Sequence, residues 1–101
     1  MKAQTYLYEK KMLLKLCIPC TDNKYSLQYI QNVISKTKIG TIKSIKEYPS
    51  QSKTNSKKVF IHMDVFDEEL QNKPYIDRLT QGQNIKVMYE EPQYWKVLLC
   101  K

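Results

Sequence analysis

Alternating apolar and polar positions predict strands in this chain. The clearest alternation runs over 57–65, where every second residue from Val59 onward is apolar. A period of two is typical of a strand with one buried face. Weaker patterns of the same kind predict three more strands, at 12–18, 41–48 and 85–89. Pro19 and Pro49 are expected to end the first two of these, because proline cannot donate to a sheet ladder.

Two other segments repeat their apolar residues at helical spacing. One helix is expected at about 27–38, with Ser26 as its N-cap, and a second at 73–80. The chain has two glycines, Gly40 and Gly82, and one follows each predicted helix. A positive φ is common at helix ends and costs glycine little, so we expect both glycines to terminate helices.

The order of these elements predicts the fold class. A β-α-β-β-α-β order in about 100 residues is typical of an α+β ferredoxin-like sandwich, in which two helices cover one face of a four-stranded antiparallel sheet. The chain has 101 residues, enough for a single domain over 1–101. We expect its core at about 12–90. Residues 93–101 are then an apolar C-terminal extension, either an added strand or a cover.

The charge of the chain indicates a class of binding partner. The chain has 17 basic and 10 acidic side chains, for a net charge of +7, and 36–63 carry seven lysines against one glutamate. Such a field attracts polyanions, including nucleic acid. All but one of the basic residues are lysine, which suits phosphate contacts better than the bidentate recognition of guanine that arginine provides.

Composition also limits where the protein acts. The longest uncharged apolar runs are far shorter than the roughly 20 residues of a membrane span, so no membrane association is expected. The first residues lack the apolar segment of a signal peptide. Three cysteines, an odd number, fit free thiols in a reducing compartment. We therefore expect a cytoplasmic protein.

The open face of the predicted sheet carries the candidate binding residues. Its outward positions are rich in lysine and include one phenylalanine, a combination that suits RNA or single-stranded DNA. Phe60 is expected to stack on a base, while Lys53, Lys57 and Lys58 hold the nucleic-acid backbone. The full set of candidates is Phe60, Lys58, Lys57, Lys53, Lys15, Lys46, Lys86 and His62.

Two segments resemble the signatures of RNA recognition motif (RRM) domains. Ser56-Lys-Lys-Val-Phe-Ile-His-Met63 is similar to the octamer signature, and Leu16-Cys-Ile-Pro-Cys-Thr21 lies where the hexamer is expected. The resemblance implies an RRM-like fold with Phe60 as a stacking residue. Lys58 and Cys17 stand at the other two stacking positions, and the octamer glycine is absent. Phosphate binding is therefore the stronger expectation, and base-specific binding the weaker one.

A second resemblance concerns the end of the chain. The segment at 89–98, with the Cys-Ile-Pro start and the Ile-Gly turn at 39–40, is similar to uncharacterised RRM-like proteins of giant DNA viruses. It implies an intracellular, virus-encoded module, in the host cell or the virion, without an assigned activity.

The sequence contains partial motifs for several catalytic and metal chemistries, none of which is expected here. Cys17-Ile-Pro-Cys20 resembles a thioredoxin-like motif, but five residues separate it from the predicted helix cap. A zinc site would have to combine Cys17, Cys20, Cys100 and His62. Acylphosphatases share the element order, yet 19–24 lack the glycine and arginine of their first loop. We expect no enzyme activity, cofactor, metal or small-molecule substrate.

The apolar extension supports an alternative hypothesis from another class. Tyr94, Trp95 and Leu98 lie in a segment that needs burial, against either the domain or a partner. The chain would then be an RRM-like adaptor that binds another protein, or a homodimer, through its sheet face or its C-terminal tail.

Overall fold

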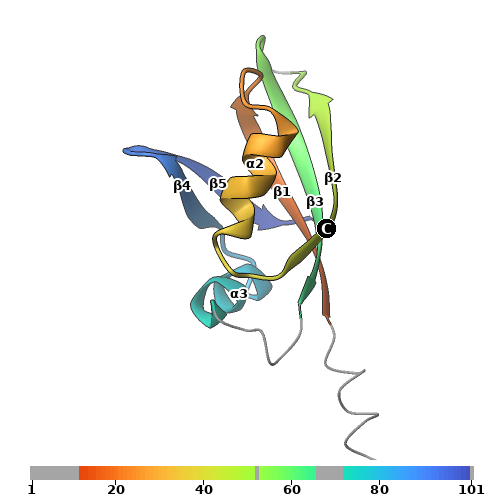
Figure 1. Ribbon diagram of the computed structural model, residues 1–101, viewed down its shortest axis with the longest axis vertical. Helices are drawn as coiled ribbons and strands as arrows, with labels where there is room; N and C mark the ends of the chain where they lie inside the picture. Colours follow the sequence, from red (N-terminus) through yellow and green to blue (C-terminus); the bar gives the residue numbers. More distant parts are fainter. Residues whose placement is uncertain (1–11, 52, 66–71, 101) are drawn as a thin grey trace, which may run out of the picture.

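The computed structural model describes residues 12–51, 53–65 and 72–100 (Figure 1). In chain order its elements are β1 (Met12–Asp22), α2 (Leu27–Ser35), β2 (Thr41–Pro49), β3 (Ser56–Val65), α3 (Lys73–Thr80), β4 (Ile85–Glu90) and β5 (Gln93–Leu99). The helix predicted at 73–80 is confirmed, and each predicted strand falls within an observed one. The fold is mostly sheet.

The sheet contradicts the predicted ferredoxin-like arrangement. Its five strands have the order β2-β3-β1-β5-β4, and all neighbouring strands are antiparallel. Residues 93–99 are therefore an internal strand, β5, and not an extension of a four-stranded RRM-like core. Only two residues separate β4 from β5, so the two strands form a hairpin, and β5 takes the place beside β1.

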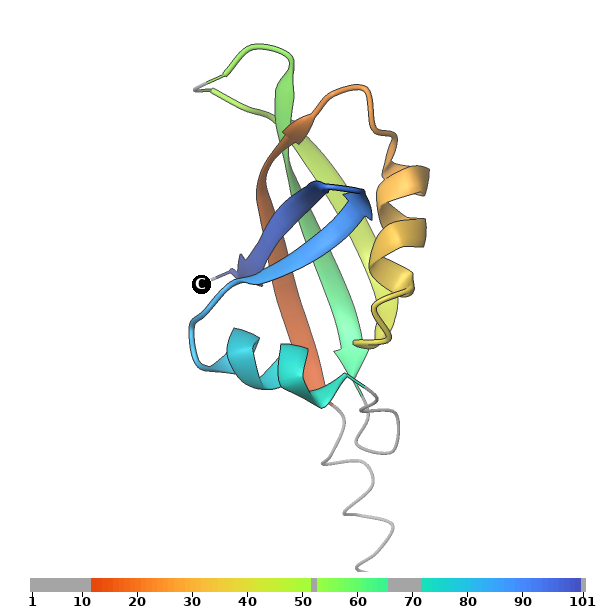
Figure 2. The same cartoon turned by 90° about the vertical axis from the view of Figure 1, so that its left-hand side faces the viewer.

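The hairpin of β4 and β5 runs obliquely to the other three strands (Figure 2). It joins β1 through two register pairs, Leu16 with Leu99 and Cys17 with Leu98. Beyond them the backbone N–H of Cys100 donates to the carbonyl oxygen of Lys15 at 2.7 Å. The junction between hairpin and sheet is therefore short.

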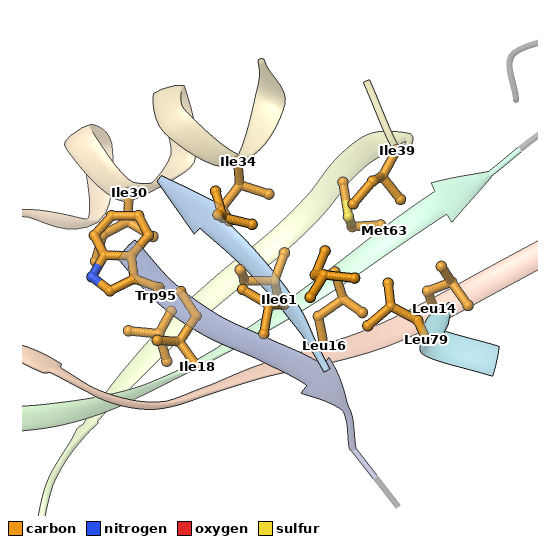
Figure 3. Packing of buried hydrophobic residues seen from close by; sticks show 14 of the residues in the cluster. Leu14, Leu16, Ile18, Ile30, Ile34, Ile39, Ile61, Met63, Leu79 and Trp95 are labelled. Carbon is orange, nitrogen blue, oxygen red and sulfur yellow. The ribbon is translucent and has the colours of Figure 1, made fainter. Parts of the chain in front are cut away.

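The core lies between α2, α3 and one face of the sheet. Figure 3 shows side chains from β1, β3 and β5 meeting those of the helices, with Trp95 beneath Ile30 of α2. Alternation along each strand supplies this layer, because every second residue points to the same face. The fully buried side chains include Leu16, Ile18, Ile30, Ile34, Ile61, Met63, Leu79, Ile85 and Val97. Burying one such side chain stabilises the fold by about 1.5–3 kcal/mol.

Two predicted element ends are wrong. β1 continues past Pro19 to Asp22, with a shift of register between Ile18 and Thr21. A bulge of this kind accommodates a proline because the ladder is already interrupted there. The first helix ends at Ser35, before the predicted 38, although its predicted N-cap is confirmed: the Ser26 hydroxyl accepts from the backbone N–H of Tyr29 at 3.1 Å.

The two glycines serve different purposes. Gly82 has a φ of 84°, as expected after a helix. After α2 the left-handed residue is Lys38, with a φ of 63°, and not Gly40. A Cβ at Gly40 would overlap the carbonyl oxygen of Asp64 and lie 2.9 Å from a methyl group of Val65. Gly40 is therefore required for close packing of the chain against the end of β3.

Candidate functional site

A groove of about 680 Å³ lies on the sheet face opposite the helices. β1, β2 and β3 form its floor, and the start of the β2–β3 loop forms one end. Its lining residues are Lys15, Pro19, Lys46, Tyr48, Pro49, Ser50, Gln51, Lys58, Phe60, His62 and Cys100. Five of the eight sequence-predicted binding residues meet here: Lys15, Lys46, Lys58, Phe60 and His62. We call this set of lining residues the sheet groove.

Each lysine of the sheet groove lies opposite a ring on the neighbouring strand. Lys46 of β2 pairs with Phe60 of β3, Tyr48 of β2 with Lys58 of β3, and Lys15 of β1 with His62 of β3. Directly opposed residues of an antiparallel pair have Cβ atoms about 4.5–5.5 Å apart. The groove therefore alternates cations and rings over a short distance.

The three groove lysines are available to a ligand. Lys15, Lys46 and Lys58 are exposed, and none of them forms a salt bridge with another described residue. Three ammonium groups without acidic partners give the groove a positive potential, which favours an anionic ligand.

Two aromatic rings form the apolar part of the groove. Tyr48 and Phe60 meet edge to face, with ring centroids 5.5 Å apart and planes at 65°. Tyr48 is 49% exposed, and Phe60 is half-buried. Ring faces held in this way offer a surface on which a planar ligand group can stack.

His62 is held by a neighbour on β2. Its Nδ1 lies 3.0 Å from the hydroxyl oxygen of Ser44, which fixes the orientation of the imidazole. The other ring nitrogen, Nε2, is left for a ligand in the groove or for water.

Lys57 and Lys53 lie outside the sheet groove. Lys57 shares the buried face of β3 with Val59, and its ammonium donates to the carboxylate of Glu47 and to the carbonyl oxygen of Tyr25, both at 2.6 Å. These contacts correct the expected role of Lys57 as part of a backbone clamp. Lys53 is exposed in the β2–β3 loop and does not line the groove.

The remaining predicted residues lie on the β4–β5 hairpin. Trp95 is 3% exposed and stacks on Tyr89 with centroids 4.3 Å apart, so it packs in the core and offers no surface to a partner. Leu98 is half-buried on the open face opposite Cys17. Tyr94 and Lys86 are exposed and contact each other, with the Lys86 Nζ 5.1 Å from the Tyr94 ring centroid.

The cysteines do not have the geometry of a thioredoxin-like site. Cys17 and Cys20 both lie within β1, and neither is at a helix N-terminus. Burial raises the pKa of the Cys17 thiol above its ordinary 9.0, and the neighbouring Cys100 adds to this. A redox nucleophile needs the opposite shift, toward the thiolate.

The described residues contain neither a cluster of potential metal ligands nor a helix that could span a membrane. No group of three or more His, Cys, Asp or Glu side chains in 12–51, 53–65 and 72–100 is placed to hold a metal ion. Within the same ranges, no helix has the length and apolar character needed to cross a bilayer.

Comparison with known proteins does not identify a relative of this chain. No match was found to protein-family models, to curated protein sequences or to solved structures. The function of this chain is therefore inferred from the residues of the site.

The sequence patterns did not single out two features of the groove. Tyr48 is two positions from Lys46 on β2, a spacing that predicts a shared face, but the sequence pattern alone assigns its ring no role. Cys100 reaches the groove because β5 lies beside β1, a pairing that the sequence does not reveal.

Proposed function

We propose that this protein binds single-stranded nucleic acid, RNA or DNA, in the sheet groove. The observation that carries the proposal is the pairing of each groove lysine with a ring on the adjacent strand. Phosphate and base alternate along a single strand, and a site for it must offer cations and ring faces at similar intervals.

In the proposed mode, Lys15, Lys46 and Lys58 contact phosphates while Phe60 and Tyr48 stack on bases. Stacking of a base on an aromatic side chain contributes about 1–3 kcal/mol and depends little on sequence. Each phosphate contact releases condensed counterions, so binding weakens as salt rises. The absence of arginine from the groove favours backbone contacts over recognition of particular bases.

The test is a salt titration with fluorescein-labelled oligothymidylate and oligouridylate, followed by anisotropy. A plot of log K against log salt has a slope of about −0.7 per phosphate contact for single strands. The variant Lys15→Ala/Lys46→Ala/Lys58→Ala is expected to reduce the magnitude of the slope by about 2 and to weaken binding at low salt.

A matched control removes three exposed lysines outside the groove: Lys24→Ala/Lys36→Ala/Lys73→Ala. Both variants have the same net charge, so a general charge effect would alter them equally. The proposal is contradicted if the two variants show equal slopes, or if the unaltered protein binds neither oligonucleotide at low salt.

A further inference from the structure

A second basic and aromatic cluster lies on the β4–β5 hairpin. The register pairs Lys86 with Lys96 and Met88 with Tyr94, and all four side chains are exposed. Tyr94 is four residues from Leu98, which pairs with Cys17 on the open face, so this cluster faces the same side of the sheet as the sheet groove. We call Lys86, Tyr94 and Lys96 the hairpin cluster.

The two lysines of this cluster repel each other. Lys86 and Lys96 are directly opposed in the ladder, an arrangement that destabilises a sheet when the charges are alike. No described acidic side chain forms a salt bridge with either lysine. Lys86 instead places its ammonium 5.1 Å from the centroid of the Tyr94 ring. An anion bound between the two ammonium groups would relieve this repulsion.

Tyr94 gives the cluster a ring surface. It is 41% exposed, and its cross-strand neighbour Met88 is 57% exposed. The ring also borders a concavity of about 370 Å³ lined by Pro19, Cys20, Pro92, Gln93, Tyr94 and Lys96. The hairpin cluster therefore repeats the chemistry of the sheet groove: Tyr94 and Lys96 border a depression, and Lys86 lies against the Tyr94 ring.

The two depressions adjoin at Pro19, which lines both. The register fixes their separation approximately. Phe60 and Leu98 both pair with Cys17, so they are two strand spacings apart, or about 10 Å, and Tyr94 lies about 13 Å farther along β5. A few nucleotides of a single strand span this distance, within the roughly 4–16 nucleotides that comparable small single-strand-binding domains cover.

We propose that the hairpin cluster is a second nucleotide subsite, in which Tyr94 stacks on a base while Lys86 and Lys96 contact the adjoining phosphate. The inference depends on the proposed function of the sheet groove and extends it. One single strand crosses from Phe60 past Pro19 to Tyr94. Affinity then depends on oligonucleotide length, because a strand too short to pass Pro19 occupies only the sheet groove and does not reach the hairpin cluster.

The experiment measures binding of oligothymidylates from about 3 to 12 nucleotides long, a range that covers the site sizes of small single-strand-binding domains. The unaltered protein is expected to gain affinity in a step once the strand reaches the hairpin. Tyr94→Ala is expected to lose roughly tenfold or more in affinity for the longest strands and to bind the shortest ones unchanged. Lys86→Gln/Lys96→Gln removes the contact with one phosphate and is expected to reduce the magnitude of the salt slope by about 0.7 for the longest strands only.

Two variants serve as controls. Tyr94→Phe keeps the ring and is expected to bind every length like the unaltered protein, whereas Phe60→Ala is expected to weaken binding of short and long strands alike. The fluorescence of Trp95, the single tryptophan, checks that each variant is folded.

The outcomes separate the two proposals. If Tyr94→Ala binds the longest strands like the unaltered protein while Phe60→Ala loses affinity, the hairpin subsite is overturned and the groove is retained. If no length binds to the unaltered protein, both proposals are overturned.

Discussion

The ammonium of Lys57 on β3 lies 2.6 Å from a carboxylate oxygen of Glu47 on β2. The same ammonium donates to the carbonyl oxygen of Tyr25, just before α2. The side chain of Lys57 is 7% exposed, whereas that of Glu47 is 45% exposed. A single buried cation thus joins two strands to the start of a helix, on the side of the sheet away from the sheet groove.

Replacing Lys57 is expected to affect stability and leave nucleic-acid binding unchanged. Lys57→Ala removes both hydrogen bonds and leaves the Tyr25 carbonyl without its donor, so we expect a loss of about 1–3 kcal/mol in the free energy of unfolding. Urea denaturation followed by Trp95 fluorescence measures this loss.

Lys58→Ala is the matched control for this prediction. Lys58 is the next residue on the same strand, but it is exposed and lines the sheet groove. Its replacement is expected to weaken oligonucleotide binding with little change in stability. A Lys57→Ala protein of normal stability but reduced affinity would show that our assignment of Lys57 is wrong.

Gly40 and Gly82 are expected to respond differently to substitution. Gly40→Ala places a methyl group against the carbonyl oxygen of Asp64, and overpacking of this kind typically costs about 1–3 kcal/mol. At Gly82 an added Cβ meets no atom within 4 Å, so alanine there bears the cost of the positive φ and no overlap.

Asparagine distinguishes these two causes. It tolerates a left-handed conformation better than alanine does, so Gly82→Asn should unfold at nearly the urea concentration of the unaltered protein. Gly40→Asn should unfold at a clearly lower one, because a larger side chain worsens the overlap. Equal midpoints for the two asparagine variants would contradict the packing role of Gly40.

The cysteines are expected to react in a defined order. Cys20 is exposed, whereas burial raises the pKa of Cys17 and so reduces its thiolate fraction. Iodoacetamide should therefore alkylate Cys20 well before Cys17 at pH 8, as measured by mass spectrometry of peptides after quenching. Labelling of Cys17 first would contradict the burial of its thiol.

The raised pKa of Cys17 also predicts a direction for stability against pH. The folded chain holds this proton more tightly than the unfolded chain, so the contribution is fully present below the unfolded pKa, near 9.0, and is lost as pH rises through the higher folded value. Cys17→Ala should be less sensitive than the unaltered protein to alkaline unfolding. Cys20→Ser should retain the full sensitivity.

The sequence predicted the local elements better than their assembly. The period of two over 57–65 identified a strand and its faces, and it also put Lys57 on the same side as Val59, which is the buried side. The expectation that Lys57 holds the nucleic-acid backbone did not take into account that Lys57 shares the buried side of the strand with Val59. Alternation in 93–99 is equally clear, with Trp95 and Val97 inward, but it predicts a strand without indicating which strand it joins. The order of strands in a sheet depends on long-range pairing. No local alternation of apolar and polar residues could therefore contradict the predicted ferredoxin-like order.

The position of β5 has a consequence for how the protein forms during synthesis. β1 has β3 on one side and β5 on the other, and residues 23–92 are synthesised between β1 and β5. Until residues 93–99 emerge, one edge of β1 presents unpaired N–H and C=O groups, a template for pairing with another chain. Contacts between such distant segments also slow folding. A nascent chain of this protein is thus open to aggregation through β1 until β5 pairs with it.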